Sequence, residues 1–165
     1  MENKFEELLV ELYGVNDDFY RISDSIKQID GHQAMLLDEL CAQIELDDAS
    51  KILRLLWAIS LSPSPTFSPT LCALLESGKG SLYIEAVVDA MHDVADEASV
   101  PCLRTALERE ERWDQDFAFN RKILWALERI GTPDAMEAVR SALESEHVRI
   151  RGTAEEILER HAGAT

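Results

Sequence analysis

Four side chains that could bind a metal ion lie in one short stretch, residues 89–96, whose sequence is DAMHDVAD. Asp89, His92, Asp93 and Asp96 stand at i, i+3, i+4 and i+7, so a helix would place them on one stripe. Imidazole nitrogen and carboxylate oxygen at this spacing could hold a divalent cation. Of the four histidines, however, only His92 is followed by a carboxylate. We therefore interpret the stripe as a solvated acidic face and expect no metal and no cofactor.

Two further patterns bear on catalysis. The stretch ESGKGS at 76–81 contains a Gly-Lys pair. The phosphate-binding loop GxxxxGK[ST] needs an earlier glycine and a preceding strand, and neither is predicted. Serines, histidines and aspartates fall on different predicted helices, without a Gly-x-Ser-x-Gly or a Cys/His grouping. We therefore predict no nucleophile in contact with a base, and we predict that the protein is not an enzyme.

The charge balance narrows the range of partners. The sequence has 32 acidic and 16 basic residues and a formal net charge of −16. A field of this sign repels phosphate backbones and anionic lipid surfaces, so we expect neither nucleic acid nor a membrane as partner. The first residues, MENKFEELLVELYG, are interrupted by acids, and no apolar run approaches about 18 residues. We expect a cytoplasmic protein.

The three cysteines fit the same expectation. Cys41, Cys72 and Cys102 show no paired spacing, and each lies among apolar residues of a helical pattern. We interpret them as small core residues in a reducing compartment.

Apolar residues recur with helical spacing along nearly the whole chain, and turn-forming clusters such as SLSPSPTFSPT at 60–70 separate these segments. A hydroxyl residue before proline, at Ser68-Pro69 and at Thr132-Pro133, predicts a helix N-cap. The pattern predicts an all-α protein. About ten helices fit the punctuation, over 2–13, 16–29, 32–44, 48–61, 68–77, 80–95, 98–110, 115–130, 133–144 and 147–161.

The chain also repeats itself. VVDAMHDVADEASVPCLRTALE, residues 87–108, aligns without a gap on ILWALERIGTPDAMEAVRSALE, residues 123–144, at an offset of 36. Apolar positions coincide, for example Met91 with Leu127. A weaker copy lies 32 residues earlier, where Ile59 stands opposite Met91. The repeated unit is a pair of helices.

A lone helix pair cannot bury its apolar stripe, so such units occur stacked on one another. We therefore predict an α-solenoid of stacked antiparallel helix pairs. The solenoid is a single domain over 1–165, with N-terminal helices or a cap over 1–62 and repeats over 63–165.

The stretch ALERIGTPDAMEAVRSALESEHVRIRGTAEEIL resembles the HEAT-like repeats of the phycobilisome-lyase type. The shared pattern is Leu127, Gly131, Pro133-Asp134, an apolar helix and then Val148-Arg149. The resemblance covers about 80–161 and implies stacked helix pairs. HEAT-like proteins include scaffolds, inhibitors, bilin lyases and hydroxylases that bind iron through several His-Glu pairs, so a HEAT-like enzyme, such as a bilin lyase or metal-dependent hydroxylase, is an alternative function.

Repeat solenoids act by binding along an extended curved face. A strongly negative face fits a basic protein partner, and Trp113 in an acidic setting fits an anchor. We predict a non-catalytic binding module, specifically a bacterial immunity or inhibitor protein that neutralises a basic toxin such as a nuclease; an adaptor or assembly factor is the alternative. The predicted partner-binding residues are Glu85, Asp89, His92, Asp93, Asp96, Glu111, Trp113, Asp114 and Asp116.

Overall fold

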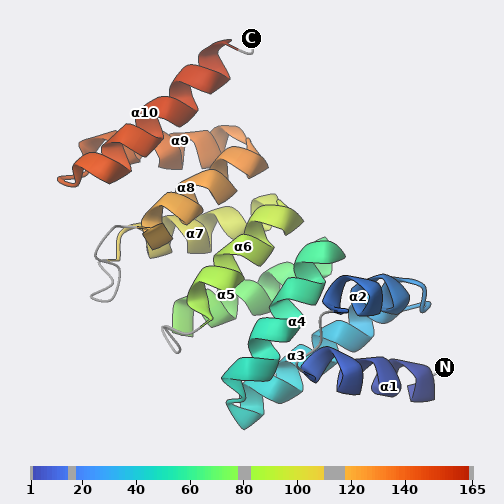
Figure 1. Ribbon diagram of the computed structural model, residues 1–165. Coiled ribbons are helices and arrows are strands. Elements are labelled where there is room, and N and C mark those ends of the chain that lie inside the picture. Colours follow the sequence, from blue (N-terminus) through green and yellow to red (C-terminus); the bar gives the residue numbers. More distant parts are fainter. Residues whose placement is uncertain (1, 15–17, 78–82, 110–117, 164–165) are drawn as a thin grey trace.

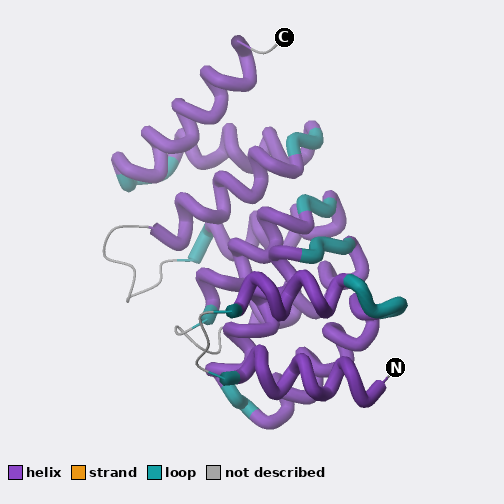
Figure 2. Tube along the Cα trace, turned by 45° about the vertical axis from the view of Figure 1, so that its right-hand side comes forward, coloured by secondary structure: helices purple, strands orange, loops and turns teal. Residues whose placement is uncertain are grey.

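The computed structural model describes residues 2–14, 18–77, 83–109 and 118–163 of the 165-residue chain. Within these ranges every regular element is helical, and there is no strand (Figures 1 and 2). The α-helices are α1 (Glu2–Tyr13), α2 (Phe19–Lys27), α3 (His32–Leu46), α4 (Ala49–Leu61), α5 (Ser68–Ser77), α6 (Ile84–Val94), α7 (Val100–Leu107), α8 (Ala118–Ile130), α9 (Pro133–Ser141) and α10 (Val148–Gly163). Three short 3-10 helices join them, namely η1 (Pro65–Phe67), η2 (Glu97–Ser99) and η3 (Ala142–Glu144). The all-α prediction and its ten helices are confirmed.

The two predicted N-caps have opposite outcomes. Thr132 caps α9 as predicted, because its hydroxyl accepts a hydrogen bond at 3.3 Å from the N–H three residues on. The prediction for Ser68 is wrong, because Ser68 already has helical dihedrals and is the first residue of α5. Ser64 instead caps the preceding η1, where its hydroxyl accepts from the Thr66 N–H at 3.4 Å. A short 3-10 turn thus replaces the expected direct start of the helix.

The helices lie in two rows. One row contains α4, α6, α8 and α10, each packed against the next, and the other contains α5, α7 and α9. Consecutive helices join the rows, since α5 packs on α6, α7 on α8 and α9 on α10. Figure 1 shows the result as a progression from α1 to α10, with the two termini at opposite ends. The row of α4, α6, α8 and α10 carries the candidate site.

Buried side chains form one continuous cluster along this progression, from Phe5 to Ile157. Ile59, Met91 and Leu127, which the alignment places at one equivalent position, are all fully buried. The repeat therefore assigns these inward positions correctly. Among the described residues, no helix combines the length and the apolar character that crossing a membrane would require.

The prediction that all three cysteines are small core residues holds for Cys102, which is buried, but it is wrong for Cys41, and two of the three are not free thiols. Cys72 of α5 and Cys102 of α7 form a disulfide with a Cα–Cα distance of 5.7 Å. Cys41 is free and exposed. The bonded residues are 30 positions apart and come together only because α5 and α7 are neighbours in one row, so sequence spacing carries no signal for the pair.

Candidate functional site

Most of the predicted acidic stripe lies on the exposed side of α6. The opposite side of this helix, including Val87, Val88 and Met91, is fully buried against the rest of the core. This burial orients Glu85 and Asp89 toward solvent with about half of each side chain exposed. His92 and Asp93 continue the stripe one turn on, with 3.2 Å between His92 Nδ1 and Asp93 Oδ1. The helix therefore gathers these four predicted residues on one surface.

Lys122 of α8 neutralises part of the stripe. Its Nζ lies 2.7 Å from Asp89 Oδ2 and 3.1 Å from Glu85 Oε2. Burial lowers the pKa of Lys122, but the hydrogen bonds to Asp89 and Glu85 outweigh this effect, so the pKa lies above its ordinary value. Asp89 thus faces an ammonium group, and within the described ranges no three His, Cys, Asp or Glu side chains gather as a metal site.

Asp96 does not continue the stripe. Helix α6 ends at Val94, and Ala95 turns the chain with a φ of 50°. Asp96 then caps η2, where its Oδ1 accepts a hydrogen bond from the Ala98 N–H at 3.2 Å. The other predicted partner-binding residues, Glu111, Trp113, Asp114 and Asp116, lie outside the described residues.

Two exposed tryptophans flank the stripe, and neither is among the site residues predicted from the sequence. Trp57 of α4 is 41% exposed and Trp125 of α8 is 38% exposed. The repeat offsets of 32 and 36 place Trp57, Asp89 and Trp125 at equivalent positions of three neighbouring helices. The alignment could therefore have identified these tryptophans, because it places both at a repeat position that is not part of the apolar core pattern.

An arginine one turn earlier lies over each indole. The guanidinium carbon of Arg54 is 5.7 Å from the ring centroid of Trp57, and that of Arg121 is 5.2 Å from the ring of Trp125. These cation–π contacts are worth roughly 0.5–1 kcal/mol at exposed sites. They favour one orientation of each indole on the surface.

The α4 end of this surface is hollowed. Phe19 of α2 packs edge-to-face on Trp57 and on Tyr20, with ring centroids 5.8 Å apart in each pair. Tyr20 itself is 70% exposed. A pocket of 450 Å³ opens here between α2 and α4, lined by Phe19, Tyr20, Arg54, Trp57, Ser60 and Leu61. We call the exposed side of α4, α6 and α8, together with this pocket, the tryptophan face.

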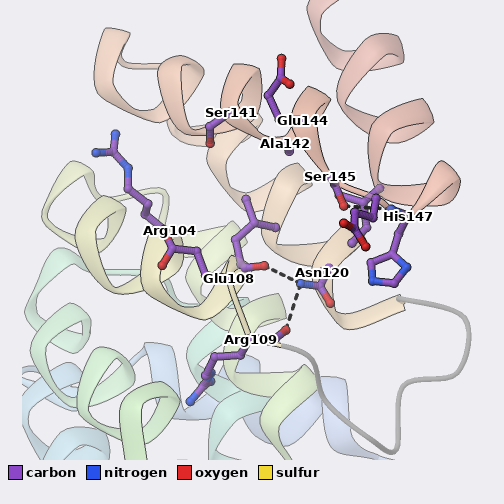
Figure 3. Close-up of a pocket in the computed structure, with 12 residues that line it drawn as sticks. Arg104, Glu108, Arg109, Asn120, Ser141, Ala142, Glu144, Ser145 and His147 are labelled. Carbon is purple, nitrogen blue, oxygen red and sulfur yellow. Dashed lines mark hydrogen bonds between the residues drawn. The ribbon is translucent and has the colours of Figure 1, made fainter.

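A second pocket, of 370 Å³, lies where α7, α8, η3 and α10 meet (Figure 3). Asn120 is buried there and donates from Nδ2 to the carbonyl oxygens of Leu107, at 2.9 Å, and Arg109, at 3.5 Å. Arg104 and Arg109 also donate to backbone carbonyls, those of Asp134 and Leu75. Because Asn120 and Arg109 donate to carbonyls in the last turns of α7 and α5, and Arg104 links α7 to the start of α9, we interpret the pocket as a structural junction.

One serine and one histidine do meet, contrary to the expectation that no nucleophile contacts a base. His32 Nε2 lies 2.7 Å from Ser62 Oγ, and His32 Nδ1 lies 3.0 Å from the carbonyl oxygen of Ile29. Sequence reasoning missed the contact because 30 residues separate the two. A carbonyl stands where a catalytic triad has a carboxylate, so the contact lacks the charge that stabilises an imidazolium. It ties the start of α3 to the end of α4.

No family model matches the sequence, and no curated protein matches it. The candidate site therefore rests on its own residues, which are the acidic stripe of α6, the lysine that pairs with it and the two tryptophans on either side.

Proposed function

We propose that this protein is an α-solenoid that binds a basic protein partner through the acidic stripe of α6, and that it acts as an inhibitor or immunity protein toward a basic toxin. The observation that carries the proposal is the placement of Glu85, Asp89 and Asp93 on one exposed helix side in a chain of net charge −16. The solenoid part is supported by the two helix rows and by the repeat, whose equivalent positions share burial.

Charge gives the stripe a kinetic role. Exposed charges of one sign raise the association rate of an oppositely charged partner by 10-fold or more at low salt. Lys122 already pairs with Glu85 and Asp89, but it brings one positive charge to three carboxylates when Asp93 is included. The stripe therefore stays net negative and attracts a cationic surface.

Inhibition is the role that we favour among binding functions. An enzyme that acts on a polyanion such as nucleic acid needs a cationic substrate groove. An acidic protein surface complements that groove and blocks substrate access when it binds there. A basic nuclease is thus the partner whose active surface best fits the stripe, whereas an adaptor would bind such a protein without reducing its activity.

The test begins with affinity capture from a lysate of the source cells at low salt, followed by mass-spectrometric identification and purification of the partner. Surface-plasmon kinetics then compare the wild type with the Asp89→Asn/Asp93→Asn double variant. We expect the double variant to associate several-fold more slowly and with a weaker dependence on ionic strength. The partner's own activity is measured with and without the wild-type protein, and we expect inhibition.

The matched control is Asp38→Asn/Glu45→Gln, which removes two charges from exposed positions of α3. We expect this control to associate at close to the wild-type rate. Equal effects of the two double variants would show that net charge, and not the α6 stripe, governs binding. Recovery of only an acidic partner would contradict the proposal. Recovery of a basic partner whose activity is unaffected would contradict its inhibitory part.

A further inference from the structure

We infer that the tryptophan face is the docking surface for the basic partner. In this assignment, which rests on the proposed function, Trp57 and Trp125 anchor a partner segment whose lysine or arginine side chains lie on the α6 stripe and whose apolar side chains cover the two indoles.

The first support is the residue types that gather there. Tryptophan, tyrosine and arginine are the residues most enriched at interface positions that dominate binding energy. The tryptophan face exposes two tryptophans and Tyr20, and it places an arginine over each indole. In the part of the chain that the structure describes, the other exposed large apolar side chains are Val10, Leu46 and Val148, which lie on three separate helices, α1, α3 and α10.

The second support is the spacing of the anchors. Trp57, Asp89 and Trp125 occupy equivalent positions on α4, α6 and α8, which pack side by side. Packed helix axes lie about 8–10 Å apart, so the two indoles stand roughly 20 Å from each other. A segment of about six residues in extended conformation spans that distance. Both anchors can therefore contact a single partner segment.

The third support is charge complementarity between the anchors. The side of α6 that faces solvent presents Glu85, Asp89 and Asp93, while Arg54 lies beside it on α4 and Arg121 and Lys122 lie beside it on α8. These carboxylates and cations balance in number, so the complementarity to a basic side chain is local to the centre of the face. A lysine or arginine at the centre of the segment would form ion pairs with the carboxylates that now pair with Lys122. Apolar side chains on its flanks would cover the indoles.

The experiment uses the full-length chain labelled with 5-fluorotryptophan. The sequence contains three tryptophans, so ¹⁹F NMR gives a separate reporter for Trp57, Trp113 and Trp125, assigned with single Trp→Phe variants. The probes are peptides from a display library of random 16-residue sequences. They are selected for binding to the unlabelled wild-type protein at physiological salt. We expect recovered peptides to be rich in lysine or arginine flanked by apolar residues, and to shift the Trp57 and Trp125 resonances together.

Affinity measurements supply the second readout. We expect Trp57→Ala and Trp125→Ala each to weaken binding of the recovered peptides by 10-fold or more, and Val148→Ala, an exposed apolar control on α10, to change it by less than about 2-fold. The wild-type resonance shifts do not depend on whether a variant folds. Basic peptides that bind without moving either resonance would overturn this docking surface and leave the proposed function standing. Recovery of acidic peptides only would overturn both.

Discussion

At the scale of single residues, the fold suppresses the ionisation of Tyr13. Its hydroxyl donates to Glu39 Oε1 at 2.5 Å, and Gln43 Nε2 donates to the same oxygen at 2.8 Å. Burial, then the hydrogen bond to Glu39 and the charge of Glu39, raise the pKa of Tyr13 above its ordinary value of 10.0. The contact joins α1 to α3.

This shift predicts a loss of stability in alkali. Above pH 10 the unfolded chain releases the phenolic proton while the folded protein retains it, so the free energy of unfolding falls as the pH rises. Tyr13→Phe has no such proton and should lose less stability over the same pH range. Urea denaturation of both proteins at pH 8 and pH 11 measures the difference. An equal loss in the two proteins would show that Tyr13 ionises as freely when folded as when unfolded.

At the scale of elements, the ends of α6 and α8 are two copies of one turn. Ala95 and Gly131, which the offset of 36 makes equivalent, both have positive φ, at 50° and 69°. Each N–H bonds to the carbonyl four residues earlier, from Ala95 to Met91 at 2.9 Å and from Gly131 to Leu127 at 3.0 Å. Only glycine adopts this left-handed conformation without steric cost.

Exchanging the two residues should therefore have opposite effects. The left-handed conformation costs a residue other than glycine about 1–2 kcal/mol. Glycine avoids this cost, but it also increases the conformational entropy of the unfolded chain, which offsets part of the stabilisation. We expect Ala95→Gly to stabilise the protein by roughly 0.5–1 kcal/mol and Gly131→Ala to destabilise it by about 1 kcal/mol. Chemical denaturation at constant m-value measures both. Destabilisation by Ala95→Gly would mean that α6 does not end in this turn.

The helices and their inward positions could be predicted because both follow from local periodicity. Leu127 and Met91 are buried where the spacing of apolar residues places them. The N-cap at Thr132 is likewise encoded within three residues. The sequence therefore specifies the elements well, but several of their ends differ from the prediction. The helices predicted over 16–29, 98–110 and 133–144 are shorter, at Phe19–Lys27, Val100–Leu107 and Pro133–Ser141.

The pairings between helices could not be predicted in the same way. Lys122 and Asp89 are 33 residues apart, and Cys72 and Cys102 are 30 apart. Whether such residues meet depends on how the helices are rotated and offset in the rows, which no local pattern encodes. The acidic stripe was thus predicted as a set of carboxylates, and its lysine partner emerged only from the packing of α8 on α6.

At the scale of the whole molecule, the distribution of charge matters more than its sum. The chain has a net charge of −16, yet the surface of α8 beside the stripe carries Arg121 and Lys122. The tryptophan face therefore combines an acidic centre with cationic and aromatic borders. Under the proposed function, this pattern would recognise a specific arrangement of charges in a partner, which a uniformly acidic surface would not do.

The most direct test of this account is the association rate of Lys122→Gln with the captured basic partner, measured across a range of ionic strength. The substitution releases Glu85 and Asp89 from their intramolecular cation. It should therefore speed association several-fold at low salt and steepen the salt dependence. The control is Arg140→Gln on α9, which removes the same charge from an ion pair with Glu137 in the other row. A Lys122→Gln rate that is unchanged, lower, or matched by the control would contradict a role for the α6 stripe in capturing the partner.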